Sequence, residues 1–183
     1  MLRRAALLAT AVVLPVVIAL VVLVNVLGPG AGDGGPVADV QGTTAAPRGD
    51  LPPIGVTTPA VTPAAELACP VLMSQLPPEL AGESSRMVRS DSPYAYAWGD
   101  PAVVLICGVD PPAGFVADAA TLVVSGVQWY VDTSDPDTVV WTTVDRTVPV
   151  EVRVPASSDS ASPTALSPII ATALPYTEPT PGA

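Results

Sequence analysis

The chain has 183 residues, of which 49% are apolar, and it carries 17 Asp and Glu against seven Arg, with no Lys and no His. Without His or Lys it lacks an imidazole base, a Schiff-base or P-loop lysine and a His-containing metal site, which excludes the commonest routes to catalysis at neutral pH. The formal net charge of −10 repels phosphate backbones and argues against a nucleic-acid partner.

Near the N-terminus, residues 5–27 form a run of 23 in which 20 side chains are apolar. A helix of this length reaches about 34 Å, enough to cross a bilayer core. Arg3 and Arg4 precede the run and the next positive charge is Arg48, so the positive-inside rule places residues 1–4 in the cytoplasm. The sequence therefore predicts a transmembrane signal anchor in the cytoplasmic membrane, single-pass, with the C-terminal part outside.

A cleaved secretory signal is the alternative to an anchor. The apolar region of such a signal is usually about 7–15 residues and ends at small residues. The run here is longer, which favours the anchor, although residues 28–31 do offer small side chains. If cleavage occurs, the protein is secreted.

The segment after the apolar run has the composition of a linker. Residues 28–64 contain eight Gly and seven Pro and show neither helical nor strand periodicity, which predicts a disordered linker. Residues 175–183 carry three Pro and are expected to form a flexible tail. One extracytoplasmic domain is therefore predicted over residues 65–174.

The start of this domain is expected to be helical. Thr62 is a candidate N-cap and Pro63 suits the first helical position, while two consecutive prolines further on predict the helix end. Residues 82–91 are expected to form a loop. Tyr94 to Trp98 are expected to form a short helical turn closed by Gly99.

Strand patterns dominate the rest of the domain. Apolar or alternating residues predict strands over residues 102–109, 127–131, 139–144 and 148–154. Residues 162–174 follow with the spacing of an amphipathic helix. The predicted fold class is α+β, with a small, mostly antiparallel sheet of about four strands, helices from both ends of the domain packed on one face, and one N-terminal transmembrane helix before it.

Cys69 and Cys107 are the only cysteines, and both lie on the outer side of the predicted membrane segment. Outside the reducing cytosol, two cysteines in a small domain most often form a disulfide bond. A reactive or metal-binding pair is the alternative, but two thiols without a His do not complete a usual metal site.

Several short motifs in order resemble a known family. They are Cys69, Leu76-Pro77, Ser92-Pro93, Ala97-Trp98-Gly99-Asp100-Pro101, Cys107-Gly108-Val109, Gly126-Val127-Gln128-Trp129 and Val152-Arg153-Val154-Pro155. Together they resemble an actinobacterial domain-of-unknown-function family, number three-five-one-five, of membrane-anchored or secreted proteins. The resemblance covers about Cys69 to Leu174 and implies a location in the cell envelope. It brings no established activity.

Aromatic residues mark the first candidate binding site. Tyr94, Tyr96 and Trp98 lie close to Asp100 at a predicted turn, an arrangement that can hold glycans or peptides by ring stacking and one acceptor. Trp129, on the predicted hairpin, is a candidate for a binding platform on the sheet. The competing interpretation of all these side chains is core packing.

Acidic residues are the second group of candidates. Asp132, Asp135 and Asp137 could gather oxygen ligands for a cation, but their spacing matches no EF-hand loop and favours a solvated turn. Asp91 and Asp100 flank the aromatic turn and could serve acid–base chemistry as in glycosidases. No catalytic residue, metal or cofactor is assigned.

The sequence therefore favours a non-enzymatic binding or envelope-maintenance module, held to the membrane by its N-terminal helix. The expected partner is an envelope protein or a cell-wall component. The alternative is an enzyme acting on cell-envelope glycans with acidic residues near Tyr94 to Asp100. Which of them holds depends on where these side chains lie in the fold.

Overall fold

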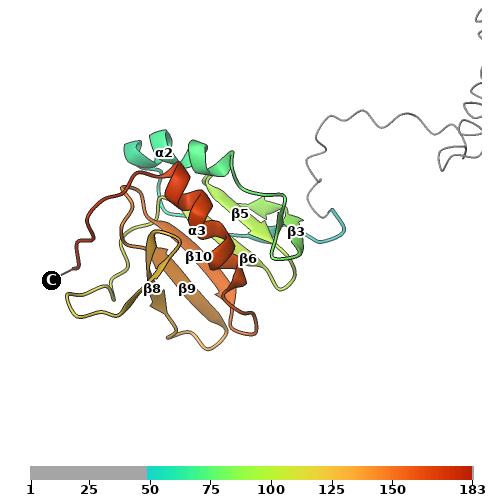
Figure 1. The fold of residues 1–183 in the computed structure, drawn as a ribbon. Coiled ribbons are helices and arrows are strands. Elements are labelled where there is room, and N and C mark those ends of the chain that lie inside the picture. The colour runs from blue at the N-terminus through green and yellow to red at the C-terminus, as the bar shows by residue number, and fades with distance from the viewer. Residues whose placement is uncertain (1–48, 183) are drawn as a thin grey trace, which may run out of the picture. The chain divides into compact units, whose positions relative to one another are not determined.

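A computed structural model describes residues 49–182 (Figure 1). Its main feature is an eight-stranded sheet in the order β2-β3-β5-β6-β10-β9-β8-β7, in which every neighbouring pair is antiparallel. The strands are β2 Glu79–Leu80, β3 Glu83–Arg86, β5 Ala95–Trp98, β6 Val103–Cys107, β7 Thr121–Val124, β8 Val127–Asp132, β9 Thr138–Thr143 and β10 Val150–Pro155. The predicted sheet of about four strands was therefore wrong, because the sheet is twice that size.

The additional strands come from segments whose sequence signal was misleading or weak. The stretch from Tyr94 to Trp98 was predicted to be helical, but Ala95–Trp98 is strand β5 and pairs with β6. Its aromatic residues alternate with Ala95 and Ala97, which is the two-residue period of a strand. The predicted loop 82–91 contains β3, whose sequence Glu-Ser-Ser-Arg has no apolar alternation.

Both predicted helices of the domain and its four predicted strands are present. Helix α2 (Pro63–Met73) begins at Thr62, whose hydroxyl accepts a hydrogen bond from the Ala65 N–H at 3.2 Å. Helix α3 spans Ala161–Ala173. Strands β6, β8, β9 and β10 occupy the four predicted segments to within a few residues.

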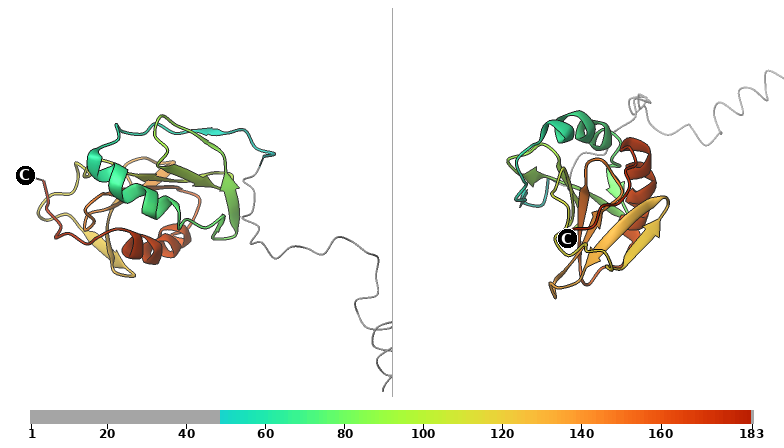
Figure 2. Two further views of the ribbon diagram at one scale, coloured as in Figure 1. Left: turned by 90° about the horizontal axis from the view of Figure 1, so that it is seen from above. Right: turned by 90° about the vertical axis from the view of Figure 1, so that its left-hand side faces the viewer.

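Both helices pack on one face of the sheet (Figure 2). The core between the layers joins Leu72 of α2 and Ile170 of α3 to Trp98, Leu105 and Val152 of the sheet, all of them fully buried. Alternation along the strands explains this arrangement, because residues two apart point to the same face.

The opposite face of the sheet is covered in part by the N-terminal segment. Strand β1 (Ile54–Gly55) runs parallel to β4 (Val88–Arg89), and the Val56 N–H donates to the Arg89 carbonyl at 2.9 Å. Val56 is buried with Ala97, Val104 and Ile106 in a second, smaller core. Residues 49–64, which composition assigns to the linker, thus contain β1, the Thr62 cap and the start of α2.

The predicted disulfide bond is confirmed. Cys69 of α2 and Cys107 of β6 are joined, with their Cα atoms 5.8 Å apart. Next to the bridge, Gly108 has a φ of +88°, and a Cβ there would lie 2.8 Å from the Cβ of Ala65. The helix and the strand approach so closely that only glycine fits.

None of the helices within residues 49–182 is both long enough and apolar enough to span a bilayer. The predicted transmembrane segment, residues 5–27, lies outside the described residues.

Candidate functional site

The aromatic residues proposed as a binding surface lie mainly in the core. Trp98 is fully buried, and its indole N–H donates to the Pro77 carbonyl at 2.9 Å. Tyr96 is half-buried with its ring centroid 4.6 Å from that of Trp98, and Tyr94 is half-buried against the same core. The structure therefore brings Tyr96 and Trp98 together, but under the helices.

Trp129 occupies a different part of the same core. It is fully buried, 6.1 Å from Trp141 in an edge-to-face arrangement, and its indole N–H donates to the Ser167 hydroxyl at 3.0 Å. That hydroxyl donates in turn to the Pro163 carbonyl at 2.7 Å. The polar edge of the ring is thus satisfied by α3, and the ring has no surface left for a ligand.

Asp100, unlike the aromatic candidates, is exposed, as is Asp91 on the other side of β5. Its carboxylate pairs with the Arg86 guanidinium at 3.1 Å, and its side chain is 56% exposed. The same guanidinium donates to the carbonyls of Gly99 and Pro52, which fastens the N-terminal segment to the β5–β6 turn. Asp100 thus lies in a surface ion pair with a structural role.

The acidic turn between β8 and β9 is organised by its own backbone. The Asp132 carboxylate accepts from the Ser134 N–H and the Asp135 carboxylate from the Asp137 N–H, both at 2.8 Å. Hydrogen bonds from the backbone and side chain of Ser134 lower the pKa of Asp132 below its ordinary value of 3.8. Across residues 49–182 we find no group of three acidic, Cys or His side chains placed to hold a metal ion.

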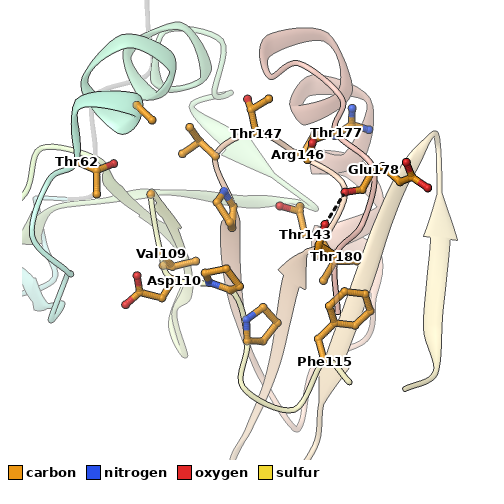
Figure 3. Close-up of a pocket in the computed structure, with 17 residues that line it drawn as sticks. Thr62, Val109, Asp110, Phe115, Thr143, Arg146, Thr147, Thr177, Glu178 and Thr180 are labelled. Atoms are coloured by element: carbon orange, nitrogen blue, oxygen red, sulfur yellow. Dashed lines mark hydrogen bonds between the residues drawn. The ribbon is translucent and has the colours of Figure 1, made fainter. Parts of the chain in front are cut away.

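A pocket that the sequence did not predict lies at one end of the sheet (Figure 3). Its volume is about 360 Å³. Four segments far apart in the sequence line it: the start of α2, residues 108–115 after β6, residues 143–149 after β9, and residues 177–180.

Backbone hydrogen bonds hold these segments together. The Gly108 N–H donates to the Pro149 carbonyl at 2.9 Å, which joins the segments after β6 and β9. The Phe115 N–H donates to the Pro112 carbonyl at 3.0 Å and forms a turn that buries the Phe115 ring. The pocket wall is therefore continuous across the strand ends.

The C-terminal segment closes one side of the pocket. The Thr147 N–H donates to the Pro175 carbonyl at 3.1 Å, and the Gly182 N–H donates to the Phe115 carbonyl at 2.8 Å. Residues 177–180 lie between these attachment points and line the pocket. This is the segment that composition assigns to a flexible tail.

A buried ion pair supports this segment. The Asp145 and Arg146 side chains are 5% and 4% exposed, and their charged atoms lie 3.5 Å apart. The Asp145 carboxylate also accepts from the Gln128 N–H, and the Arg146 guanidinium donates to the Gly126 carbonyl and lies 5.9 Å from the Tyr176 ring centroid. The positive charge of Arg146 is thus neutralised within the fold.

The electrostatic character of the pocket is acidic. Residues 49–182 carry 15 carboxylates and four arginines, a net charge of −11. Of the charged pocket residues, Asp110 and Glu178 are exposed, whereas Arg146 is buried beside Asp145. Figure 3 shows the Asp110 and Glu178 side chains on opposite sides of the pocket.

Sequence reasoning missed this site because no contiguous motif encodes it. Asp110-Pro111-Pro112 directly after a buried strand was the available signal, since a loop at a strand end that cannot continue the sheet is a common place for a binding site. Nothing in the sequence pattern, however, brings Glu178 to the same place.

Fold and site define a disulfide-bonded antiparallel sheet, covered on one face by two helices, with an acidic pocket at one end of its strands. The family described as "Protein of unknown function (DUF3515)" matches residues 9–179. The chain belongs to this family. No curated protein and no solved structure matches the chain.

Proposed function

We propose that the protein is a non-enzymatic binding module that acts outside the cytoplasmic membrane and holds its ligand in the pocket at the end of the sheet. The observation that supports this most strongly is the pocket itself, which has about 360 Å³ of space and exposed carboxylates on opposite sides. Small-molecule sites commonly have volumes of about 300–1,000 Å³.

The lining favours a cationic, peptide-like ligand. Pro111, Pro112, Pro149 and Phe115 provide apolar walls, and the threonine hydroxyls between them can donate or accept hydrogen bonds. Asp110 and Glu178 would attract an amine or guanidinium in a protein whose net charge already favours cations. Such a ligand fits a basic segment of an envelope protein or an amine-bearing wall peptide.

The proposed location rests on two observations. The apolar run 5–27 behind Arg3 and Arg4 supports a chain held at the cytoplasmic membrane with its C-terminal part outside. The Cys69–Cys107 bond supports an oxidising compartment. The intact mass of the chain recovered from membranes and from the culture medium will distinguish an anchor from a cleaved signal, because cleavage near residue 28 would remove the first 27 residues or so.

A glycan-acting enzyme built on Tyr94 to Asp100 finds no supporting observation. The Trp98 ring is buried, and the Asp100 carboxylate is bound to Arg86. General acid–base catalysis on a glycan requires two carboxylic groups that face a common substrate. The binding module is therefore the proposal.

Photocrosslinking in living cells tests the pocket directly. A photoreactive phenylalanine analogue at Thr180, which lines the pocket, should give a discrete adduct. The same substitution at Thr164, an exposed threonine of α3 outside the pocket, is the matched control and should give none. Sensitivity of the adduct to protease or to a wall hydrolase would identify a protein or a wall component. Equal labelling from both positions would contradict a site in the pocket.

A further inference from the structure

The outer edge of β7 is an unprotected strand edge. Strand β7 is the last strand of the sheet and lies in a hairpin with β8 (Figure 2). Its sequence, Thr-Leu-Val-Val, has no charge and no proline, and Leu122 and Val123 are 51% and 71% exposed. We infer that this edge pairs with the β7 edge of a second copy of the chain.

The backbone of β7 has hydrogen-bonding groups that point away from the sheet. The Ser125-Gly126 turn joins Val124 to its partner Val127 in a two-residue hairpin, so Val124 and Leu122 bond inward to β8. Gln128, opposite Val123, uses its N–H and carbonyl on the other side, with Asp145 and Val144. The N–H and carbonyl groups of Thr121 and Val123 therefore point outward, where the described chain has no further strand.

The two edge strands of the sheet differ in how well they are protected against pairing with another strand. At the opposite edge, β2 has only two residues, follows Pro77-Pro78 and exposes the charged Glu79. Proteins block strand edges with such short strands, prolines and charges because a free edge recruits another strand. Since β7 is longer than β2 and has neither a proline nor a charge, its edge is suited to pairing with another strand.

The distribution of charge favours a second copy as the occupant. Apart from Asp145, which is buried and paired with Arg146, the acidic residues near β7 lie at one end: Asp118 precedes the strand, and Asp132 lies beyond the Thr121–Tyr130 pair. The other end is the Ser125-Gly126 turn, which has no charge of its own and contacts the buried, mutually neutralised Asp145–Arg146 pair. In an antiparallel pair, the acidic end of each copy lies beside the uncharged turn of the other, so the charge of −11 is not concentrated at the contact.

The outward backbone groups of Thr121 and Val123 also determine the register in which two β7 strands can pair. Pairing Thr121 with Val123 of the partner subunit, and the reverse, satisfies four backbone hydrogen bonds within the strands. The twofold axis then passes between the two copies of Leu122, a non-hydrogen-bonded pair with Cα atoms about 4.5 Å apart. Strands of four residues bury little area, so the dimer should be weak and depend on concentration. No residue of β7 lines the pocket, so this inference stands apart from the proposed function.

Cysteine crosslinking of the full chain in mild detergent tests this register. Leu122→Cys should give a disulfide-linked dimer under mild oxidation, because the Cα separation suits a disulfide. Ser125→Cys is the matched control on the same hairpin, since its two copies would lie about 20 Å apart in this register. We expect at least tenfold more covalent dimer from Leu122→Cys. Equal yields from the two variants, or no dimer from either, would overturn the inference.

A second variant separates strand pairing from simple collision. Val123→Pro removes an outward N–H that β8 does not use, so the fold should tolerate it while the pairing should not. Adding it to Leu122→Cys should lower the dimer yield at least tenfold, with the native Cys69–Cys107 bond intact. An unchanged yield would contradict pairing through the β7 edge. Sedimentation of the unmodified chain should show mass increasing with concentration, and a constant monomer mass would also overturn the inference.

Discussion

Trp98 shows how a side chain that looks like a ligand contact can be a core residue. Its ring is fully buried, and its only polar atom donates to the Pro77 carbonyl. We predict that Trp98→Ala lowers the free energy of unfolding by about 3–5 kcal/mol because it leaves a large cavity. Asp100→Asn, at the exposed ion pair, should cost less than about 1 kcal/mol. Urea denaturation measures both, and comparable losses would contradict this assignment.

Gly108 directly follows β6 and lies against Ala65 of α2. Gly108→Ala must place a Cβ 2.8 Å from that of Ala65, at a φ of +88°. Gly82→Ala is the matched control, since Gly82 has a φ of +87° but no atom within 4 Å of the added Cβ. Both variants bear the cost of a left-handed conformation, and overlap should add about 1–3 kcal/mol at Gly108 only. Equal thermal stability of the two variants would show that the contact is not tight.

The disulfide bond links the first helix of the domain to the centre of the sheet. It joins positions 38 apart in the sequence, so its loss should lower the free energy of unfolding by about 4 kcal/mol in the loop-entropy model. The Cys69→Ala/Cys107→Ala variant measures this without leaving reactive thiols. If its denaturation midpoint matched that of the parent chain, the bond would not be a main constraint on the fold.

The elements differ in how far their sequences reveal them. Strand β10 could be predicted because Val150, Val152 and Val154 alternate with Glu151 and Arg153. Helix α2 could be predicted from its cap. Strands β2 and β3 could not, since short polar edge strands lack apolar alternation and depend on their neighbours. At β5, Gly99 resembled the end of a helical turn, but the segment instead pairs with the buried strand β6.

The candidate site is a property of the whole molecule. Asp110 and Glu178 lie 68 positions apart in the sequence. The Thr147–Pro175 and Gly182–Phe115 backbone hydrogen bonds hold the C-terminal segment in place, so that both carboxylates line one pocket. The net negative charge could be predicted from composition alone, whereas the pocket could be located only in the folded structure. The aromatic residues that attracted attention in the sequence instead form the core that supports it.

The most direct test of a cation-binding pocket is the dependence of the Thr180 photocrosslink on its two carboxylates. The Asp110→Asn/Glu178→Gln variant removes both exposed charges of the pocket. The Glu79→Gln/Asp91→Asn variant makes the same charge change at exposed residues outside the pocket. We predict at least a tenfold loss of adduct in the first variant and an unchanged yield in the second. Undiminished crosslinking in the first variant, or an equal loss in both, would contradict the proposal that the pocket binds a cationic ligand.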